Sequence, residues 1–444
     1  MSIDFRLRDF AHPFSIWRLH RALERNQWLS PREVAVYRDE RLRAIVRHAY
    51  RNVPFYRQRF DEAGVDPKDI RGAADLDRLP LLSKETVRRA GESIHARGAS
   101  RYHPIEHRTS GTTGEPLLFL LDRFANSLEF AYYWRHWSWA GFELGDRFAE
   151  LGTTHFLKRP ELIDSPAHWQ PHLRRLMLNG VQLSARRAAD MAAAMRRHRP
   201  QFIKGMASTL FFLARCFDEA GAYAPPLRAA FSTGEMLSQS FRETIESVFS
   251  CPVLDSYGHM ERTVAIAQCP QGGYHVNSDY GLLEVVDQQR SPTSETRVGK
   301  AVGTSLHNLA MPLLRYEVGD RIELLPEDQT CSCGRGLPLV KAIQGREEDV
   351  VVTPDGRYLT AIFILPEFVD GIGFAQFVQD QRDSLVINVV PIAGWSDEQR
   401  RKLTGYASRL LGGSMKLAVR TVEASEIEVD PSGKRRVVIS QIAD

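Results

Sequence analysis

The stretch that decides the fold runs from residue 109 to residue 121. It reads Thr109-Ser110-Gly111-Thr112-Thr113-Gly114-Glu115-Pro116, followed by the apolar run Leu117–Leu121. Glycines let a backbone approach a polyphosphate closely, and hydroxyls together with successive N–H groups can surround its oxygens. It is not a Walker A loop, because Glu115 stands where that motif needs lysine. The three-glycine spacing of a dinucleotide site is also absent. Taken alone, the segment is equally consistent with a polar turn before a strand.

Further motifs follow this loop in order along the chain. They are Gly234-Glu235-Met236, Asp255-Ser256-Tyr257-Gly258-His259-Met260-Glu261, Arg315-Tyr316-Glu317-Val318-Gly319-Asp320, Gly345-Arg346-Glu347-Glu348-Asp349 and Pro431-Ser432-Gly433-Lys434. Two more stretches, His48–Tyr56 and Asn308–Tyr316, belong to the same set. The ordered set resembles the acyl-adenylate-forming superfamily, and within it the phenylacetate-CoA ligase branch with its capsule-locus relatives. The resemblance covers nearly the whole chain.

The periodicity of the chain gives its own account of the fold. Helical spacing dominates to about Arg97, and short strands then alternate with helices, which predicts a largely parallel sheet. The stretches Tyr280–Val286, Gly299–Asn308 and Asp320–Leu324 look more antiparallel and barrel-like. The resemblance implies an α/β fold with a large N-terminal adenylate-forming domain, residues 1–345, and a small mobile C-terminal α+β lid, residues 346–444.

Size and composition limit the classes of function. A chain of 444 residues with 43% hydrophobic and 25% charged residues predicts a globular protein of two or more domains. A net charge of +3 and the lack of a basic run with aromatics give no reason to expect nucleic acid as a partner. No apolar run is long enough to span a bilayer, and five cysteines are too few for a disulfide framework. We expect a cytoplasmic protein, and a homodimer stays open.

Adenylation brings a carboxylate against the α-phosphate of ATP, so the site needs a cation, a metal and fixed donors. By the resemblance, Tyr257 offers its face to adenine, Gly258 permits close approach, and Asp255 reads the adenine amino group. Glu261 would hold Mg²⁺, and Asp320 would accept hydrogen bonds from both ribose hydroxyls. Further nucleotide-binding residues are Thr109, Ser110, Gly111, Thr112, Thr113, Gly114, Gly234, Glu235, Met236 and Ser256. A buried turn residue is the alternative reading of each.

The last two motifs serve the small domain in the same resemblance. Arg346 would make a second ribose contact, Glu348 would be the hinge, and Lys434 would be the catalytic lysine that bridges carboxylate and α-phosphate. A solvated cluster of charges is the alternative. One residue departs from the family pattern, because Met260 stands where a hydroxyl usually meets the α-phosphate. That contact is then either lost or taken over by His259 or the Thr109–Thr113 loop.

Cysteine and histidine form a second group. Three thiols and one imidazole, from Cys269, His275, Cys331 and Cys333, make a complete tetrahedral set for a structural Zn²⁺. Relatives in the branch carry similar cysteines. The spacing is not a standard CxxC pair, so reduced thiols in a core or loop remain the alternative.

Three hypotheses about function follow. The first is an ATP-dependent, AMP-forming ligase that converts a small carboxylic acid, with an aryl acid such as phenylacetate favoured, into an acyl-CoA. The aromatic segment Phe130–Trp139 and the stretch Lys204–Ser208 could line its acid pocket, although aromatic stripes are more often plain core. In the second, the acyl group or AMP passes to a non-CoA acceptor, since Val350–Arg357 lacks the Arg-Gly pair usual in this branch. In the third, Met260 and this change mark a degenerate homologue.

The N-terminal segment Phe5–Tyr37 mixes aromatic and aliphatic residues with arginines. Such a pattern could be an amphipathic helix on a membrane surface. A helix that packs its apolar stripe against the domain is the commoner outcome, so we do not expect membrane contact.

Overall fold

A computed structural model describes residues 13–108, 117–286, 298–326, 329–344, 351–359, 362–412, 415–428 and 436–442. Its α-helices are α1 (Pro13–Asn26), α2 (Pro31–Asn52), α3 (Pro54–Ala63), α4 (Lys84–Ala90), α5 (Arg123–Ser138), α6 (Thr154–Leu157), α7 (Ala185–His198), α8 (Ala207–Glu219), α9 (Gln239–Phe249) and α10 (Asp397–Leu411). The caps follow known rules, and α2 begins with a capping box between Ser30 and Glu33.

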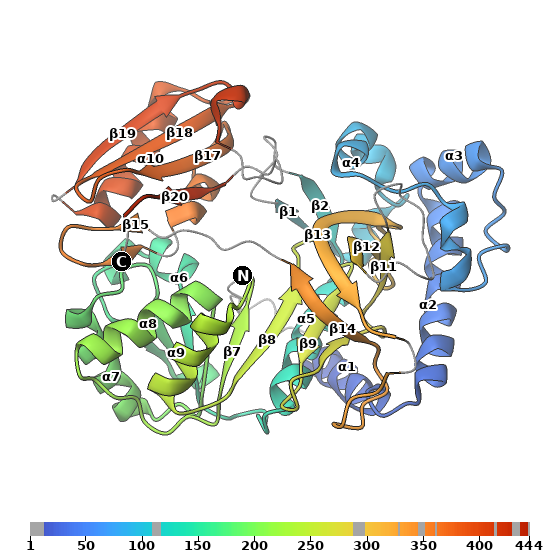
Figure 1. Cartoon of the computed structure of the whole chain (residues 1–444). Helices are drawn as coiled ribbons and strands as arrows, with labels where there is room; N and C mark the ends of the chain where they lie inside the picture. The colour runs from blue at the N-terminus through green and yellow to red at the C-terminus, as the bar shows by residue number, and fades with distance from the viewer. Residues whose placement is uncertain are drawn as a thin grey trace.

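A large sheet forms the centre of the molecule (Figure 1). Its parallel part comprises β3 (Phe148–Gly152), β5 (Arg175–Asn179), β6 (Phe202–Gly205), β7 (Ala229–Thr233) and β8 (Val253–Gly258), with β4 (Ala167–Gln170) antiparallel at the edge. Successive side chains of a strand face opposite sides. Phe202 accordingly packs in the cluster with α1 and α5, while Ile203 packs in the cluster with α7, α8 and α9. Helices therefore cover both faces.

The remaining strands of this sheet are antiparallel. They are β9 (Ala265–Gln268), β10 (Tyr274–Val276), β11 (Gly281–Val286), β12 (Val298–Ser305), β13 (Tyr316–Leu324) and β14 (Leu339–Gln344), in the order β11-β12-β13-β14-β10-β9-β8. Four strand spacings, about 19 Å in a flat sheet, would separate β8 from β13. The Tyr257 hydroxyl on β8 nevertheless lies 2.8 Å from Asp320 Oδ2 on β13. This part of the sheet therefore curls on itself, and the barrel-like portion is confirmed.

One expected strand has a different partner. The apolar run after the glycine loop is β2 (Leu118–Leu121), which pairs with β1 (Ile105–Arg108) in a separate antiparallel hairpin. Periodicity identifies such a strand but carries no information about its partner. Asp122, which caps α5, also accepts a hydrogen bond from the Leu309 N–H and so ties this hairpin to the antiparallel part of the large sheet.

A second sheet lies at the upper left of Figure 1. It has the order β19-β18-β17-β20 and comprises β17 (Ile372–Gln379), β18 (Ser384–Pro391), β19 (Lys416–Thr421) and β20 (Val438–Ser440). Helix α10 packs on it, and the short pair β15 (Val351–Val352) and β16 (Tyr358–Leu359) precedes it. This is the small α+β unit expected from the sequence. The division at residue 345 stays a prediction, because residues 345–350 lie outside the described part.

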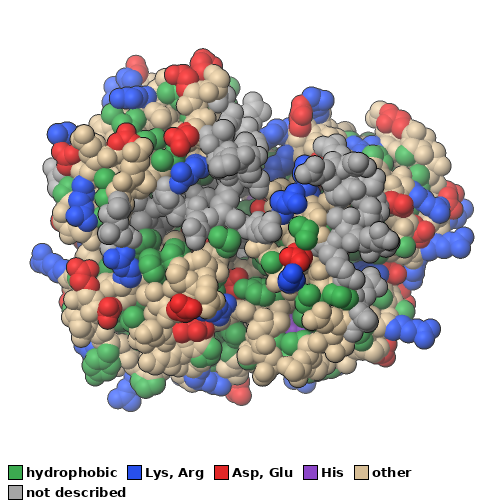
Figure 2. All heavy atoms as spheres, in the orientation of Figure 1, with side chains coloured by type: hydrophobic (Ala, Val, Ile, Leu, Met, Phe, Trp, Pro, Cys, Tyr) green, Lys and Arg blue, Asp and Glu red, His purple; other side chains and the backbone are tan. Residues whose placement is uncertain are grey.

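From residue 13 onward, the N-terminal segment contains two helices rather than one. The apolar side of α1 is buried against α5, as expected, and α2 contributes Leu42, Ile45 and Val46 to the core beside the antiparallel strands. Among the described residues, no helix has the length and apolar character needed to cross a membrane. On the face shown in Figure 2, basic and acidic side chains are interspersed, in keeping with the small net charge.

Candidate active site and metal centre

The Asp255–Glu261 motif lies where the large sheet changes from parallel to antiparallel pairing. β8 runs parallel to β7 and antiparallel to β9, and the motif occupies the carboxyl end of β8. Ligands of open α/β sheets bind outside this end of the strands. The curl of the sheet brings the Arg315–Asp320 motif to the same place, so two motifs far apart in sequence share one site.

Tyr257 and Asp320 form the first contact between these motifs. The Tyr257 hydroxyl donates a 2.8 Å hydrogen bond to Asp320 Oδ2. Burial and the neighbouring Asp320 carboxylate raise the pKa of Tyr257 well above its ordinary value, so its proton stays in place. The structure therefore brings together the residue predicted to stack on adenine and the residue predicted to bind ribose.

Asp255 lies two residues earlier on the same strand and is almost fully buried. Its Oδ2 accepts a 3.1 Å hydrogen bond from the Tyr274 hydroxyl. Its Oδ1 has no hydrogen-bond partner among the described residues. Burial raises the pKa of Asp255 to about 6. A buried carboxylate oxygen without a donor is costly, which makes this oxygen a candidate acceptor for a ligand.

Glu261 is the centre of the second contact. Its Oε1 accepts a 2.6 Å hydrogen bond from the Tyr316 hydroxyl and lies 3.6 Å from Lys84 Nζ. Burial opposes ionisation, but His259 and Lys84 outweigh it and lower the pKa of Glu261. Lys84 reaches this position because Leu82 bridges to Tyr316 just before α4 begins. Neither Lys84 nor Tyr316 was predicted as a site residue.

The two residues between Tyr257–Gly258 and Glu261 have different surroundings. His259 Nε2 lies 2.8 Å from Thr263 Oγ1, while its Nδ1 has no hydrogen-bond partner among the described residues. Burial lowers the pKa of His259, while the neighbouring Glu261 and Asp320 carboxylates oppose this shift. Met260 packs against the core and provides no donor. The structure thus leaves an unpartnered ring nitrogen beside the position where the family pattern has a hydroxyl.

Two glycines, Gly281 on β11 and Gly303 on β12, lie directly against Thr263. A Cβ at Gly281 would clash with the Thr263 carbonyl oxygen, and a Cβ at Gly303 would clash with its hydroxyl. Only glycine permits this approach. β11 and β12 therefore press against the turn that holds His259 and Glu261.

The Gly234–Met236 segment follows β7 and is anchored to α8, the helix that precedes β7 in the chain. Glu235 Oε2 accepts a 2.8 Å hydrogen bond from the Ser208 N–H at the start of α8, and burial raises its pKa. Gly234 has a φ of 83°, which favours glycine. Thr109–Gly114, Arg346, Glu348 and Lys434 lie outside the described residues, and their roles stay predictions.

The cysteine and histidine residues converge as expected. Cys269 follows β9, His275 lies on β10, and Cys331 and Cys333 precede β14. These three strands are neighbours in the sheet. The potential ligand atoms of all four residues lie within 4.8 Å of one another. Tetrahedral zinc, with Zn–S bonds of about 2.3 Å, suits this spacing. His275 Nδ1 lies 3.3 Å from the Leu337 carbonyl oxygen, which leaves Nε2 facing the thiols. These residues fit a zinc ion.

A further buried ionic cluster lies across the parallel strands. Glu150 on β3 accepts hydrogen bonds from Arg175 NH1 at 2.8 Å and Lys204 Nζ at 3.2 Å. Lys204 Nζ also lies 5.9 Å from the Tyr133 ring and 5.5 Å from the Trp137 ring, both on α5. Burial opposes the ionisation of Glu150, but the two cations lower its pKa. Lys204 was considered as a pocket wall from the sequence, whereas Glu150 and Arg175 were not.

Known proteins resemble this chain over most of its length. The CapK C-terminal domain family matches residues 351–441. A phenylacetate-coenzyme A ligase from Thermus thermophilus is 29% identical over 331 residues, 72% of each chain. Protein CapK from Staphylococcus aureus is 21% identical over 412 residues, 91% of this chain and 88% of that protein. These matches span both sheets.

The solved structure of 2-hydroxyisobutyryl-CoA ligase in complex with 2-HIB-AMP and CoA has a TM-score of 0.61 and 21% identity, and it covers 94% of this chain and 92% of the ligase. The fold is that of the adenylate-forming CoA ligases. In sequence the chain is similar to the phenylacetate-coenzyme A ligases and to protein CapK.

Proposed function

We propose that this protein is an ATP-dependent, AMP-forming ligase that converts a carboxylic acid into an acyl-adenylate and then into an acyl-CoA. The observation that carries the proposal is the pair of contacts Tyr257–Asp320 and Glu261–Tyr316. They gather two distant motifs at the carboxyl end of β8, where the fold family binds its nucleotide. In this proposal residues 346–444 act as the lid over the large domain.

The buried polar atoms support a place for the nucleoside. The adenine amino group is a donor, and Asp255 Oδ1 is a buried acceptor that has no partner among the residues that the structure describes. A ribose diol needs an acceptor close to the base, and the Tyr257 hydrogen bond holds Asp320 beside the face proposed for adenine. The two neighbouring contacts together account for the adenosine part of ATP.

Glu261 would hold Mg²⁺ against the phosphates. The Tyr316 hydroxyl orients its carboxylate, and Lys84 supplies a cation near the place that the metal would take. The metal would neutralise charge that develops on the phosphates. Within the described part of the chain His259 Nδ1 has no partner, which supports it as the phosphate contact that replaces the hydroxyl missing at Met260.

An aryl acid such as phenylacetate is the favoured substrate. The Tyr133 hydroxyl on α5 is 3.3 Å from Thr233 Oγ1 at the end of β7, and Trp137 stacks on Phe231 within that strand. Both aromatic rings are buried in the core cluster shared with α1. A non-CoA acceptor stays the second candidate. Arg357, in the segment that departs from the usual pattern, donates to the Leu410 and Leu411 carbonyl oxygens at the end of α10. This arginine caps a helix and is not available for a CoA phosphate.

Pyrophosphate release and thiol consumption test the reaction. With ATP, Mg²⁺ and a panel of aryl and aliphatic acids, the wild type should release pyrophosphate and consume CoA. Lys434→Ala should slow adenylate formation by roughly two to three powers of ten, because a preorganised cation is lost. It should leave transfer from a synthetic acyl-adenylate nearly intact. Pyrophosphate release without CoA consumption would favour another acceptor, and no release with any acid would favour the degenerate homologue.

We also propose a structural Zn²⁺ at Cys269, His275, Cys331 and Cys333. Four protein ligands leave no open position, so the ion would hold β9, β10 and the loop before β14 together without taking part in the reaction. Protein purified without chelator should carry about one equivalent, and Cys331→Ser should lower it sharply. Elemental analysis that finds no zinc in the wild type would refute this site and leave the ligase proposal intact.

A further inference from the structure

Helix α1 has a second apolar feature besides its buried side. Ile16 and Leu23 pack in the core cluster shared with α5. The outward side carries large aromatics, with Phe14 71% exposed, Trp17 47% exposed and Trp28, just after the helix, 58% exposed. The other exposed large apolar residues in the described part of the chain lie singly in different helices, strands and loops. Exposed aromatics are therefore concentrated on this one segment.

Arginines share this outward side. Arg18, Arg21 and Arg25 are exposed and recur at helical spacing between Phe14 and Trp28. We name the whole set the α1 stripe: Phe14, Trp17, Arg18, Arg21, Arg25 and Trp28. The helix has one acidic residue, Glu24, which is half-buried and accepts a 2.9 Å hydrogen bond from Ser138 Oγ. The α1 stripe thus combines aromatic rings with positive charge and contains no carboxylate.

Arg335, which lies outside the helix, places a further positive charge beside an aromatic ring of the α1 stripe. The Arg335 guanidinium lies 5.0 Å from the centroid of the Trp28 ring and 4.3 Å from that of Trp139. It holds the Trp28 ring at the surface and adds a cation at that end of the stripe. A helix of 14 residues is about 21 Å long, so the stripe presents an elongated flat contact.

From these features we propose that the α1 stripe binds the surface of an anionic lipid bilayer, with α1 parallel to the membrane plane. Tryptophan and phenylalanine rings partition into the headgroup region, and arginines attract anionic headgroups. The buried side of α1 keeps the helix attached to α5, so the whole protein is held peripherally. The inference does not depend on the ligase activity.

Vesicle flotation with the full-length protein tests this proposal. The protein should float with vesicles of phosphatidylglycerol and phosphatidylcholine at low salt, and much less with phosphatidylcholine alone or in high salt. Phe14→Ser with Trp17→Ser should lower binding at least tenfold. Arg18→Gln, Arg21→Gln and Arg25→Gln together should lower it on the order of a hundredfold, since each arginine near an anionic surface contributes about fivefold. Circular dichroism should show unchanged folding, because the substituted side chains are exposed.

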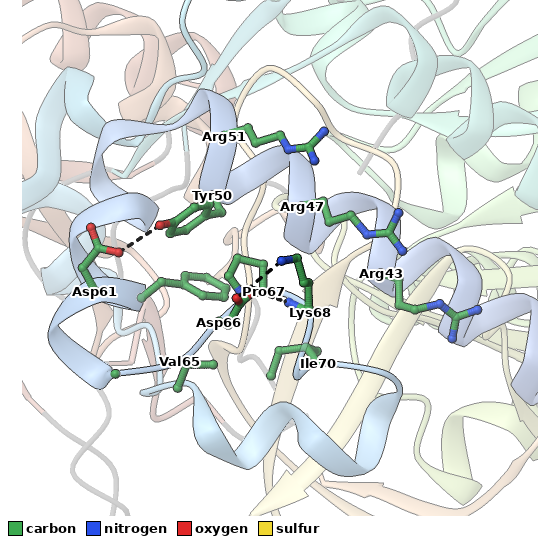
Figure 3. A pocket seen from close by; sticks show the side chains of 12 residues that line it. Arg43, Arg47, Tyr50, Arg51, Asp61, Val65, Asp66, Pro67, Lys68 and Ile70 are labelled. Atoms are coloured by element: carbon green, nitrogen blue, oxygen red, sulfur yellow. Dashed lines mark hydrogen bonds and ion pairs between the residues drawn. The ribbon is translucent and has the colours of Figure 1, made fainter.

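A second cationic surface provides the matched control. Arg47, Arg51 and Lys68 line a cavity of about 730 Å³ between α2 and the segment after α3 (Figure 3). These three side chains are exposed too, but the apolar residues beside them are buried, as Phe60 and Ile70 are, or partly buried, as Val65 is. The triple glutamine variant at these positions removes the same charge and should retain vesicle binding.

Three outcomes would overturn the proposal. The first is equal loss of binding in the control triple variant, which would mean that net charge alone decides. The second is no flotation of the wild type at low salt. The third is a dimer in sedimentation equilibrium without lipid that Phe14→Ser with Trp17→Ser converts to monomer, because a second copy of the chain would then be the occupant of the stripe.

Discussion

The two parts of the large sheet hold buried carboxylates in opposite ways. In the parallel part, Glu150 is paired with two cations through short hydrogen bonds, and all three side chains are almost fully buried. At the carboxyl end of β8, where the antiparallel part begins, Glu261 has one cation at a longer distance, on a Lys84 side chain that is 29% exposed, and Asp255 keeps an oxygen without a partner among the described residues. A buried carboxylate whose hydrogen bonds and charge are fully paired stabilises the fold. A buried carboxylate that lacks part of this pairing is suited to binding a ligand.

The largest effect on stability is expected in the parallel part. Glu150→Gln leaves Lys204 and Arg175 buried without their carboxylate, and the free energy of unfolding should fall by about 3–5 kcal/mol. Urea denaturation measures this loss. Lys204→Met in the same background should recover part of it, because one uncompensated charge is removed. A loss below about 1 kcal/mol would show that the cluster is not essential to the fold.

Glu261→Gln should behave in the reverse way. Glutamine still accepts the Tyr316 hydrogen bond, so stability should change little, but the metal loses its charged ligand. We expect adenylate formation to slow by roughly two to three powers of ten. Pyrophosphate release and urea denaturation on the same preparation measure both. If stability falls as much as in Glu150→Gln, Glu261 is structural and the contrast between the two parts fails.

Asp255 should give the chain a dependence of stability on pH. Burial raises its pKa from the ordinary 3.8 to about 6, so the folded state binds its proton more tightly than the unfolded state. Stability relative to Asp255→Asn should therefore fall as pH rises from about 4 to 6 and stay low above, by up to about 3 kcal/mol. Thermal unfolding of both proteins across this range measures it. Parallel curves would show that Asp255 is not strained in the free protein.

The smallest effect is expected at Lys84. Its amine is partly exposed and 3.6 Å from Glu261, so Lys84→Met should change the free energy of unfolding by less than about 1 kcal/mol. Removing a cation that competes for Glu261 should lower the Mg²⁺ concentration needed for half-maximal rate by less than about tenfold. A titration with Mg²⁺ measures this shift. A higher requirement would mean that Lys84 assists the metal.

Elements with a clear period were predictable from the sequence. The stretch expected at Tyr280–Val286 is β11 (Gly281–Val286), and the stretch expected at Gly299–Asn308 is β12 (Val298–Ser305). Local period determines such elements. The partner of β2 was not predictable, because strand pairing depends on the tertiary arrangement.

The candidate site was also predictable only in part, because some of its residues belong to sequence motifs and others do not. The motifs identify Tyr257, Glu261 and Asp320, and the chemistry of the ligands identifies the cysteine and histidine cluster. Tyr316 lay within a quoted motif, but nothing in the sequence showed that its hydroxyl would meet Glu261. Lys84 gave no signal at all, because it reaches the site through the bridge between Leu82 and Tyr316. Such contacts arise from the curl of the sheet, which sequence spacing does not report.

The close approach of Gly281 and Gly303 to Thr263 has a consequence for recombining these enzymes. In a chimera whose crossover falls between residues 263 and 281, Thr263 comes from one parent. The residues at positions 281 and 303, which must leave space for Thr263, come from the other parent. Any parent with a side chain at either glycine position would force Thr263 aside and, through its 2.8 Å contact, displace His259. Crossovers before residue 253 or after residue 303 keep the turn and its clearance within one inherited block.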